Sequence, residues 1–518
     1  MTVRLVRVHA ESYADSVRLM SARRSMDDVD GTGLVAAVMG TQANREDLVG
    51  QGFDSSDLDG VGANDLVLAV EAASEQAARA ALDAAEATLS GAGQDLRAPA
   101  TADGERHPRT LEQAVATLNG ANVALISVPA DYAVLEAHKA LSAGLHVLLF
   151  SSGISVDDEI ELKDRGRRLG LLVMGPDAGT AMLGRVGLGF ANVVDRGPVG
   201  VVAAAGTGAQ EVMTLLHRWG AGPSHVIGVG GRDTSAAVGG AMTRMALRAL
   251  RDDDATEVLL LVSKPPSPEV ARTLLREFDG VPAVAAFVGL EPDTLLAPRG
   301  LHLAPTLEQA VLATLAALGR DQPDPGAGMA AVADHALSDL SDERQAVRGL
   351  FSGGTLCYEA MVLTSRRLGA VHSNTPLERD WGLPAPDGAH IFLDLGAEEF
   401  TQGRPHPMID PEPRVDALRE HGDDPATAVV LFDVVLGYGA HPDPAGVLAP
   451  ACAEITARPD PPAVVAYVLG TTDEPQDLTA QRERLADAGC VLAPTNARAA
   501  LLATAIASRR PDIAEDRA

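Results

Sequence analysis

Cysteine, aromatic side chains and positive charge are all scarce in this chain of 518 residues. Its three cysteines, Cys357, Cys452 and Cys490, stand at no metal-ligand spacing, so we expect no metal site, and such low usage fits a reducing cytoplasm. Lysine and arginine total 42 against 71 acidic residues, a formal net charge of −29. So acidic a chain binds nucleic acid or an anionic membrane poorly, and an anionic substrate must be held by local donors.

Long apolar runs are missing as well. No stretch approaches the roughly 20 residues that span a bilayer, and the N-terminus has no signal-like core. We therefore expect a cytoplasmic protein. Apolar residues still make up 46% of the chain, which is ample for buried cores, and the length predicts three or four domains.

Short apolar strands alternate with amphipathic helices along most of the chain, which predicts an α/β fold with largely parallel sheets. The first domain resembles a small, ferredoxin-like unit, and the second opens without the G-x-G-x-x-G fingerprint, so a nicotinamide cofactor is not expected. The last two are flavodoxin-like. The predicted domains are 1–90, a Rossmann-like domain over 109–195 with a charged helix over Val156–Leu169, and two similar domains over 197–320 and 349–509. Ser90–Pro108 is predicted to be a linker, and Ala330–Arg348 a helical connector.

Two glycine-rich turns follow apolar strands in those last two domains. Gly206-Thr207-Gly208 follows the strand 199–204, and Ser352-Gly353-Gly354-Thr355 follows Leu350-Phe351. A glycine turn that opens a helix leaves backbone N–H groups unpaired at the positive end of the helix dipole. Such a turn is a candidate phosphate site, although glycine can also serve only to make the turn tight.

The two domains repeat one another beyond their turns. Leu303-Ala304-Pro305-Thr306 recurs as Leu492-Ala493-Pro494-Thr495, and an Ala/Leu-rich helix is predicted after each. The period is too long for a solenoid. We therefore predict two fused copies of one domain, related by a pseudo-twofold axis, that bring the two glycine turns together.

Several loop residues are further candidates. Arg232 is suited to bidentate binding of a phosphate, or it completes a turn. In the proline-rich loop 403–410, Arg404 can clamp an oxyanion and His406 can exchange a proton near neutral pH, unless the loop is only structural. His441 follows an apolar strand, at the edge where ligands collect in open α/β sheets. Lys264, before two prolines, is a weaker candidate.

These motifs together resemble the FdrA-like family of the succinyl-CoA synthetase, or acyl-CoA ligase, superfamily. The segment from Val128 to Asp177 is similar to the CoA-binding domain of that superfamily without its first strand and glycine loop. The turns at 206–208 and 353–355 resemble the helix N-termini that hold phosphate there. Further matches are Asp394–Thr401, Gly403–Asp410 and Leu436–Pro444.

The resemblance implies acyl-phosphate chemistry with partner subunits, and it makes CoA a candidate ligand. Ligases of the superfamily form a phosphohistidine within a Gly-His-Ala-Gly segment and use an ATP-grasp partner. That segment is missing here, although His302 lies near its place in the first repeat. FdrA-like proteins are associated with oxamate carbamoyltransferase in purine and allantoin breakdown, and carbamoyl phosphate is already activated. The preferred hypothesis is therefore carbamoyl transfer to oxamate. The alternatives are an acyl-CoA ligase subunit and a non-catalytic, CoA-sensing scaffold.

Overall fold

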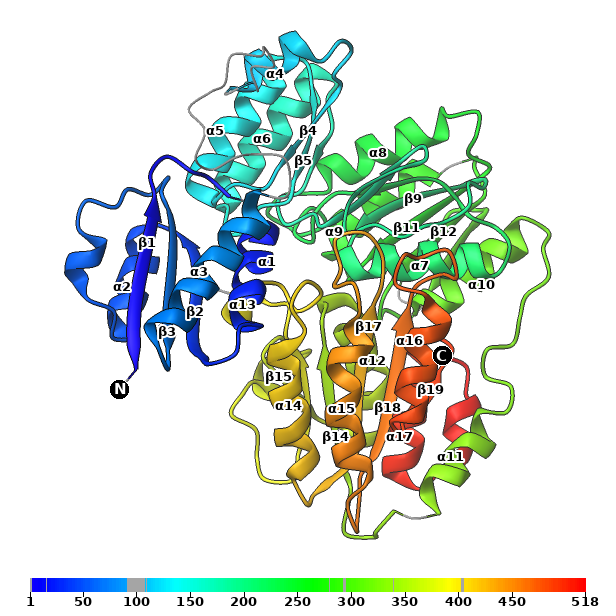
Figure 1. Cartoon of the computed structure of the whole chain (residues 1–518). Helices are drawn as coiled ribbons and strands as arrows, with labels where there is room; N and C mark the ends of the chain where they lie inside the picture. Colours follow the sequence, from blue (N-terminus) through cyan, green and yellow to red (C-terminus); the bar gives the residue numbers. More distant parts are fainter. Residues whose placement is uncertain are drawn as a thin grey trace. The chain divides into compact units, whose positions relative to one another are not determined.

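The computed structural model describes residues 2–14, 16–90, 108, 110–278, 280–291, 295–338, 340–401 and 405–518. These residues form two compact units: the N-terminal domain, to which Pro405 is also assigned, and a second unit made of Pro108–Thr401 and His406–Ala518. Figure 1 traces both units along the chain. The linker predicted over Ser90–Pro108 lies almost wholly outside the described residues. Among the described helices, none has the length and apolar composition needed to cross a bilayer.

The first unit is a helix-covered antiparallel sheet with the strand order β1-β3-β2. The sheet's central strand is fully apolar on its buried face, and α1 and α3 pack against it through side chains such as Met26, Leu68 and Leu82. This arrangement fits the expected ferredoxin-like domain. The elements are β1 (Val3–His9), α1 (Ser16–Asp27), β2 (Thr32–Met39), α2 (Gln42–Gly50), η1 (Ser55–Leu58), β3 (Leu66–Ala72) and α3 (Glu75–Ser90).

The second unit begins with a parallel three-stranded sheet in the order β4-β5-β6. Its strands are short and apolar, and alanines of α5 such as Ala133 and Ala137 pack closely on them. The charged helix predicted over 156–169 is observed with those bounds. The elements are α4 (Leu111–Thr117), β4 (Val123–Ile126), α5 (Ala130–Ser142), β5 (His146–Leu149), α6 (Val156–Leu169) and β6 (Val173–Met174).

The first ligase-like domain has a seven-stranded sheet in the order β13-β12-β11-β9-β10-β7-β8. The hairpin β7–β8 pairs antiparallel with β10, so residues 180–189 belong to this seven-stranded sheet. The predicted range 109–195 had placed them in the preceding domain. The elements are β7 (Thr180–Leu183), β8 (Val186–Gly189), β9 (Val199–Ala204), α7 (Gly206–Arg218), β10 (Pro223–Gly228), α8 (Ala241–Arg251), β11 (Val258–Ser263), α9 (Pro268–Leu275), η2 (Arg276–Phe278), β12 (Ala283–Phe287), β13 (Leu301–Ala304) and α10 (Leu307–Ala317).

The second ligase-like domain follows α11 and has a parallel sheet in the order β15-β16-β14-β17-β18-β19. The elements are α11 (Met329–Leu337), β14 (Ala346–Phe351), α12 (Gly354–Leu368), β15 (Val371–Ser373), η4 (Arg379–Trp381), β16 (His390–Asp394), α13 (Glu398–Thr401), α14 (Glu412–Asp423), β17 (Thr427–Val435), α15 (Pro444–Thr456), β18 (Ala463–Leu469), α16 (Leu478–Asp487), β19 (Val491–Ala493), α17 (Asn496–Ser508) and η5 (Pro511–Glu515).

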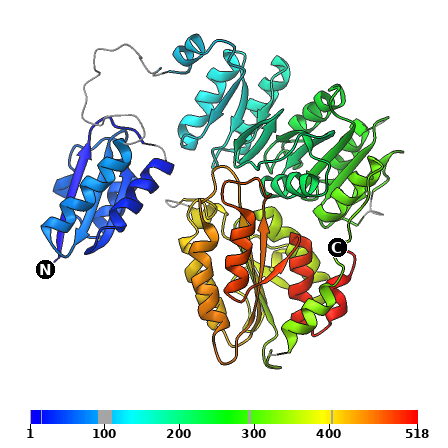
Figure 2. The ribbon, with the colours of Figure 1, turned by 45° about the vertical axis from the view of Figure 1, so that its right-hand side comes forward.

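Helices cover both faces of this sheet (Figures 1 and 2). Alternate residues of β17 face opposite ways: Phe432 packs with α14, α15 and α16, whereas Leu431 packs with α12 and α17. The core around α12 and α17 is continuous with that of the first ligase-like domain and includes Leu215 and Leu307. The two repeats therefore share one apolar core, which fixes the helices at their interface.

One sequence expectation is wrong at its C-terminal end. A helical connector was expected over 330–348, but α11 ends at Leu337 and β14 begins at Ala346. Arg348 misleads the pattern, because its buried guanidinium pairs with Asp424 at 2.6 Å inside an otherwise apolar strand. A charged residue in a buried strand resembles the polar position of an amphipathic helix.

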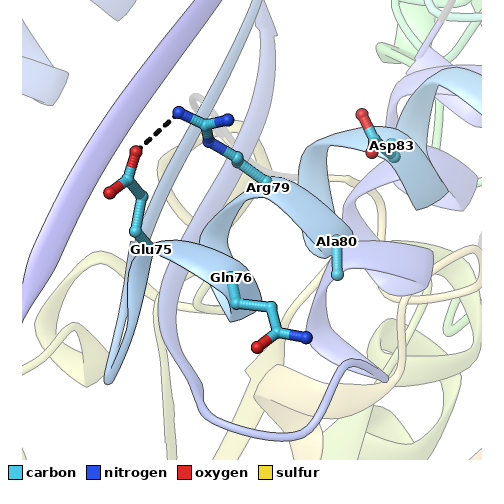
Figure 3. A pocket seen from close by; sticks show the side chains of 5 residues that line it. All are labelled: Glu75, Gln76, Arg79, Ala80 and Asp83. Atoms are coloured by element: carbon cyan, nitrogen blue, oxygen red, sulfur yellow. Dashed lines mark hydrogen bonds and ion pairs between the residues drawn. The ribbon is translucent and has the colours of Figure 1, made fainter.

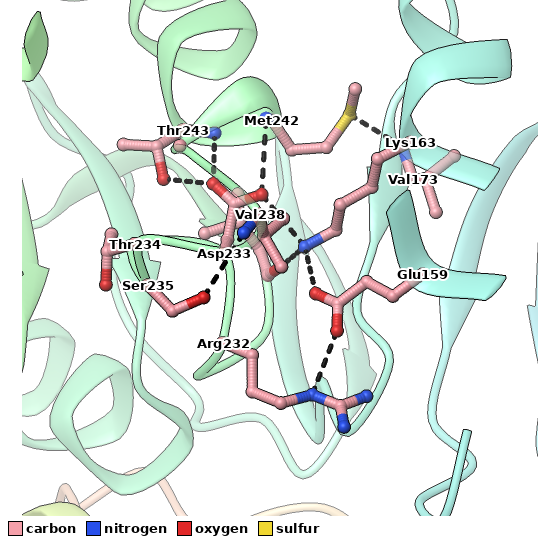
Figure 4. Close-up of polar contacts among 12 residues, drawn as sticks. Glu159, Lys163, Val173, Arg232, Asp233, Thr234, Ser235, Val238, Met242 and Thr243 are labelled. Carbon is pink, nitrogen blue, oxygen red and sulfur yellow. Dashed lines mark hydrogen bonds and ion pairs between the residues drawn. The ribbon is translucent and has the colours of Figure 1, made fainter. Parts of the chain in front are cut away.

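A buried lysine of α6 links the domain with the sheet β4-β5-β6 to the first ligase-like domain (Figure 4). Lys163 of α6 lies 2.7 Å from Glu159 and 2.8 Å from Asp233, and its ammonium also donates to the carbonyl of Val229 at 2.9 Å. Asp233 in turn accepts from the backbone N–H and the hydroxyl of Thr243, at the start of α8. The network is fully buried, so each charge depends on its partners.

We predict that Lys163→Met lowers the free energy of unfolding by about 3–5 kcal/mol, because buried Asp233 loses its cation and buried Glu159 keeps only the partly exposed Arg232. Chemical denaturation measures this change. Lys139→Met is the matched control: its ion pair with Glu136 is partly exposed and screened by water, so we expect a much smaller loss. Equal losses in the two variants would contradict the role given to Lys163.

Candidate functional site

The N-termini of α7 and α12 meet at the interface of the two repeats. A Cβ atom on Gly353 would lie 2.2 Å from Thr207 Cγ2, and one on Gly208 would lie 2.8 Å from Thr355 Cγ2. The contacts are reciprocal, as a pseudo-twofold arrangement requires. Only glycine permits so close an approach at Gly353 and Gly208, which explains the glycines of both turns.

Neither helix start has a side-chain cap. The N-cap residues are Ala205 for α7 and Gly353 for α12, and no side chain in the described part of the chain caps either helix. Other helices of this unit begin with a capping side chain, such as Ser155, Thr306 and Thr495. Two adjacent helix starts therefore present unpaired donors and two positive dipole ends in one place.

The hydroxyl of Thr207 is a second sign of a ligand. Thr207 is 5% exposed, and its Oγ1 makes no hydrogen bond with any described residue. This oxygen lies 2.7 Å from the position of a Cβ on Gly353, so it faces the start of α12. Burying a hydroxyl that makes no hydrogen bond is costly unless a ligand binds it. An anion between the two helix starts would accept a hydrogen bond from Thr207 Oγ1.

The turn before α12 is held by a buried carboxylate. Asp433 Oδ1 accepts from the backbone N–H of Ser352 at 2.9 Å and from its hydroxyl at 2.8 Å. Arg414 neutralises Asp433 and also donates to the carbonyl of Leu350. Ser352 therefore positions the turn, and its hydroxyl proton is already committed. Anion binding stays a prediction for Gly353, Gly354 and Thr355.

Two buried glutamates tie the repeats together behind the glycine turns. Glu211 of α7 accepts from the backbone N–H of Asn496, the first residue of α17, at 3.2 Å. Glu359 of α12 accepts from the backbone N–H of Leu307, the first residue of α10, at 2.7 Å. Each repeat thus caps a helix of the other, and those helices follow the repeated Leu-Ala-Pro-Thr segments.

Burial raises the pKa of both glutamates. The pKa of Glu211 rises to about 7 because the side chain is desolvated, although hydrogen bonds from Tyr467 and Asn496 lower it. The pKa of Glu359 rises to about 8 for the same reason, and the hydrogen bond from Asn496 opposes the rise. The two carboxyl groups therefore titrate near neutral pH in the folded protein.

His406 lies beside the turn that precedes α12. A Cβ on Gly396 would lie 2.8 Å from His406 Nε2 and 2.6 Å from the carbonyl oxygen of Ser352. His406 Nδ1 accepts from the backbone N–H of Met408, so a neutral ring carries its proton on Nε2. Burial, with a smaller effect of the Arg414 cation, lowers the pKa of His406 to about 4. At neutral pH His406 is therefore a hydrogen-bond donor and not a cation.

The remaining predicted residues are more dispersed. His441 is 8% exposed; its ring Nδ1 accepts from the backbone N–H of Asp443, and its backbone N–H donates to the carbonyl of Met408. Arg232 pairs with Glu159 at 2.9 Å, which occupies one edge of its guanidinium. Arg404 and Gly403 lie outside the described residues. The structure thus joins the two glycine turns and His406, while the roles of all these residues stay predictions.

Sequence reasoning gave no role to Glu211, Glu359 or Asp394. A usable signal was present: 206 to 211 and 354 to 359 are the same step from the first residue of each helix to a glutamate. Asp394 ends β16 at the carboxyl edge of the sheet and lies next to Gly354. Lys264, ranked low from its sequence, approaches the same glycine from the other repeat.

A shallow surface depression also follows α3 in the N-terminal domain (Figure 3). Arg79 lies 2.6 Å from Glu75, one helical turn earlier, and both side chains are more than half exposed. Gln76, Ala80 and Asp83 complete the lining. Exposed charges that pair along one helix provide solubility and contribute little binding energy.

Comparison with known proteins identifies the family to which this fold belongs. The family model described as "CoA-ligase" matches residues 350–506, and "AllF, heavy metal-associated domain" matches residues 1–106. The second ligase-like domain and its glycine turn are therefore of the CoA-ligase type. The chain is a member of the acyl-CoA ligase superfamily.

The relatives define the family more narrowly. The uncharacterised protein YahF of Escherichia coli is 39% identical over 393 residues, which are 74% of this chain and 76% of YahF. The succinate–CoA ligase [ADP-forming] subunit alpha 2 of Archaeoglobus fulgidus is 31% identical over 33% of this chain and 59% of that subunit. The apo acetyl-CoA synthetase 1 of Candidatus Korarchaeum cryptofilum covers 76% of this chain and 84% of its own, with 16% identity and a TM-score of 0.31. The chain belongs to the FdrA-like family of the succinyl-CoA synthetase superfamily.

The N-terminal domain does not fit a heavy-metal site, despite the name of its family model. Residues 1–106 contain no cysteine and one histidine, His9, whereas heavy metals prefer thiolate and imidazole ligands. His9 lies 3.1 Å from Glu86. Among the described residues, no group of three His, Cys, Asp or Glu side chains is placed to hold a metal ion. We derive no metal chemistry from this domain.

We predict that Thr207→Val weakens phosphate binding at least about tenfold, because a hydrogen bond to an anion is lost. Stability should be unchanged or rise by about 1 kcal/mol, since the hydroxyl loses no hydrogen bond to any residue that the structure describes. Isothermal titration with inorganic phosphate and thermal unfolding measure the two effects. Thr214→Val, which removes a hydroxyl bonded to Gln210 in the same helix, should cost stability and leave phosphate binding intact. The reverse pattern would contradict the site.

A second prediction concerns pH. Since the pKa of Glu359 is about 8 in the folded protein and near 4.5 when unfolded, the folded state binds more protons between these values. The free energy of unfolding should therefore fall as pH rises from about 5 to 8, by up to about 1.4 kcal/mol per pH unit for this group. Glu359→Gln should flatten that slope, whereas the exposed Glu399→Gln should keep it. A Glu359→Gln slope like that of the wild type would show that Glu359 ionises normally.

Proposed function

We propose that this chain is a subunit of an enzyme that transfers a carbamoyl group between phosphate and oxamate, together with partner subunits. One observation carries the proposal: two uncapped helix starts meet beside a buried Thr207 hydroxyl that has no hydrogen-bond partner among the described residues. Donors that are fixed before the reaction stabilise the charge that develops on a departing phosphate. The relatives support the acyl-phosphate chemistry, and the carbamoyl group is the finer assignment that we add.

The histidines favour transfer from a substrate phosphate over a phosphorylated enzyme. In the observed geometry the neutral ring of His406 carries its proton on Nε2, and its Nδ1 accepts from the backbone N–H of Met408, so neither ring nitrogen has a free lone pair to attack a phosphoryl group. The glutamates that follow the glycine turns cap helices of the opposite repeat. Carbamoyl phosphate is a mixed anhydride, so its transfer requires neither a phosphohistidine nor ATP.

A ligase subunit that takes ATP-grasp from another chain is the second candidate. Similarity to the alpha subunit of a succinate–CoA ligase favours it, since that protein is named as one subunit of an ADP-forming enzyme. This reading predicts dependence on CoA and nucleotide. A non-catalytic scaffold predicts neither activity.

Phosphate release separates these readings. We expect the assembled complex to release phosphate from carbamoyl phosphate only when oxamate is present, and to need neither ADP nor CoA. Gly354→Leu should abolish release, because a Cβ there would lie 2.5 Å from Asp394 Oδ2 and the side chain would fill the helix start.

Gly382→Ala is the matched control, because a Cβ at Gly382 meets only the carbonyl of Arg379 at 3.7 Å. This variant should keep full activity. Activity only with CoA and nucleotide would establish the ligase instead. Unchanged activity in Gly354→Leu would contradict the helix-start site.

A further inference from the structure

Two charged groups from different repeats flank Gly354, the first residue of α12. The position of a Cβ on Gly354 is 2.5 Å from Asp394 Oδ2 and 3.8 Å from Lys264 Nζ. Asp394 is the last residue of β16, next to β14 in the second sheet. Lys264 follows β11, next to β9 in the first sheet. Both groups therefore come from strand ends at the edge where α7 and α12 begin.

Asp394 is held with one oxygen uncommitted. Its backbone forms two hydrogen bonds with the side chain of Asn374, and its Oδ1 accepts from the backbone N–H of Gly396 at 3.1 Å. No described residue donates a hydrogen bond to Oδ2, the oxygen that faces Gly354. The side chain is 7% exposed. A rigid carboxyl group with one unengaged oxygen is placed to exchange a proton with a molecule bound at the helix start.

Its surroundings tune Asp394 toward neutral pH. Burial raises the pKa of Asp394 to about 6, the Lys264 cation opposes the rise, and the carboxylates of Asp433 and Asp177 add to it. The nearby thiol of Cys357 is fully buried, and burial raises its pKa well above the usual value, so it contributes no charge. A base with a pKa just below the working pH is ionised and still accepts a proton readily.

Lys264 supplies a positive charge that no described residue neutralises in an ion pair. Its ammonium lies 5.1 Å from the centre of the Tyr358 ring and forms neither a hydrogen bond nor an ion pair with the described residues. Tyr358 belongs to the first two turns of α12, so the cation stays close to that helix start. In a chain with net charge −29, an unpaired cation beside an uncapped helix is suited to an anionic substrate.

We propose that Asp394 is the catalytic base of the transfer, and that Lys264 of the other repeat holds the phosphate beside it. This assignment rests on the proposed function. The amide nitrogen of an oxamate-like acceptor attacks the carbamoyl carbon; a C–N bond forms, and the C–O bond to phosphate breaks. The electron pair leaves with the phosphate oxygen, and the N–H proton moves to Asp394 Oδ2. In the reverse direction protonated Asp394 returns that proton to the leaving nitrogen.

The test compares Asp394→Asn with the wild type in the assembled complex. We expect kcat for carbamoyl transfer to fall at least about 100-fold. Binding of inorganic phosphate should be unchanged or tighter, because a negative charge next to the anion is removed. The wild-type kcat/KM should decline as pH falls through about 6, since the base becomes protonated, and the residual activity of Asp394→Asn should lack this decline.

Controls separate the role of Asp394 from the proposed function on which it rests. The surface variant Asp380→Asn should keep wild-type activity and pH profile. Lys264→Met should weaken phosphate binding at least about tenfold, and Lys264→Arg should restore part of it. Wild-type activity in Asp394→Asn, or an unaltered pH profile, would overturn the role of Asp394. Absence of phosphate binding in the wild-type protein would instead refute the proposed function, and the base assignment with it.

Discussion

The reciprocal capping by Glu211 and Glu359 is the interaction on which the rest of the structure depends. Each carboxyl group crosses the interface and accepts from the first N–H of a helix in the other repeat. Both groups are fully buried, so their hydrogen bonds are strong and their loss is costly. Because the glutamates lie on α7 and α12, these two hydrogen bonds also hold both helices, and the glycine turns before them, in place at the interface.

The function that we propose follows from that constraint. A single glycine turn is a weak anion site, but two turns locked face to face combine their donors and dipoles. The interface also brings Lys264 and Asp394 from opposite repeats to the same glycine. The two repeats, fused in one chain, thus bring together a set of residues that neither repeat contains alone.

Much of this architecture could be predicted from the sequence because its signals are local. Apolar strands, the charged helix over 156–169 and the two glycine turns are each defined by neighbouring residues. The Leu-Ala-Pro-Thr echo was correctly taken as a repeat, and the structure explains it: Thr306 and Thr495 are the N-caps of α10 and α17.

What could not be predicted depends on contacts between distant residues. Lys163 resembles any polar position of α6 until Asp233 is seen 70 residues away. The strand that contains Arg348 was taken for part of a helix, because the residue that pairs with the buried arginine, Asp424, lies far away in the sequence. Arg232 was expected to bind a phosphate or to complete a turn, and its ion pair with Glu159 could not be predicted from its neighbours; phosphate binding by Arg232 stays a prediction. For the same reason Asp394 belongs to a sequence motif for which no role could be predicted, since its position beside Gly354 appears only in the folded chain.

The most direct test of the central claim is a crystal structure of the protein soaked in inorganic phosphate. The account predicts phosphate density between the first-turn N–H groups of α7 and α12, in contact with Thr207 Oγ1. Clear density for these residues with no anion between them, at a phosphate concentration that saturates binding in solution, would contradict it.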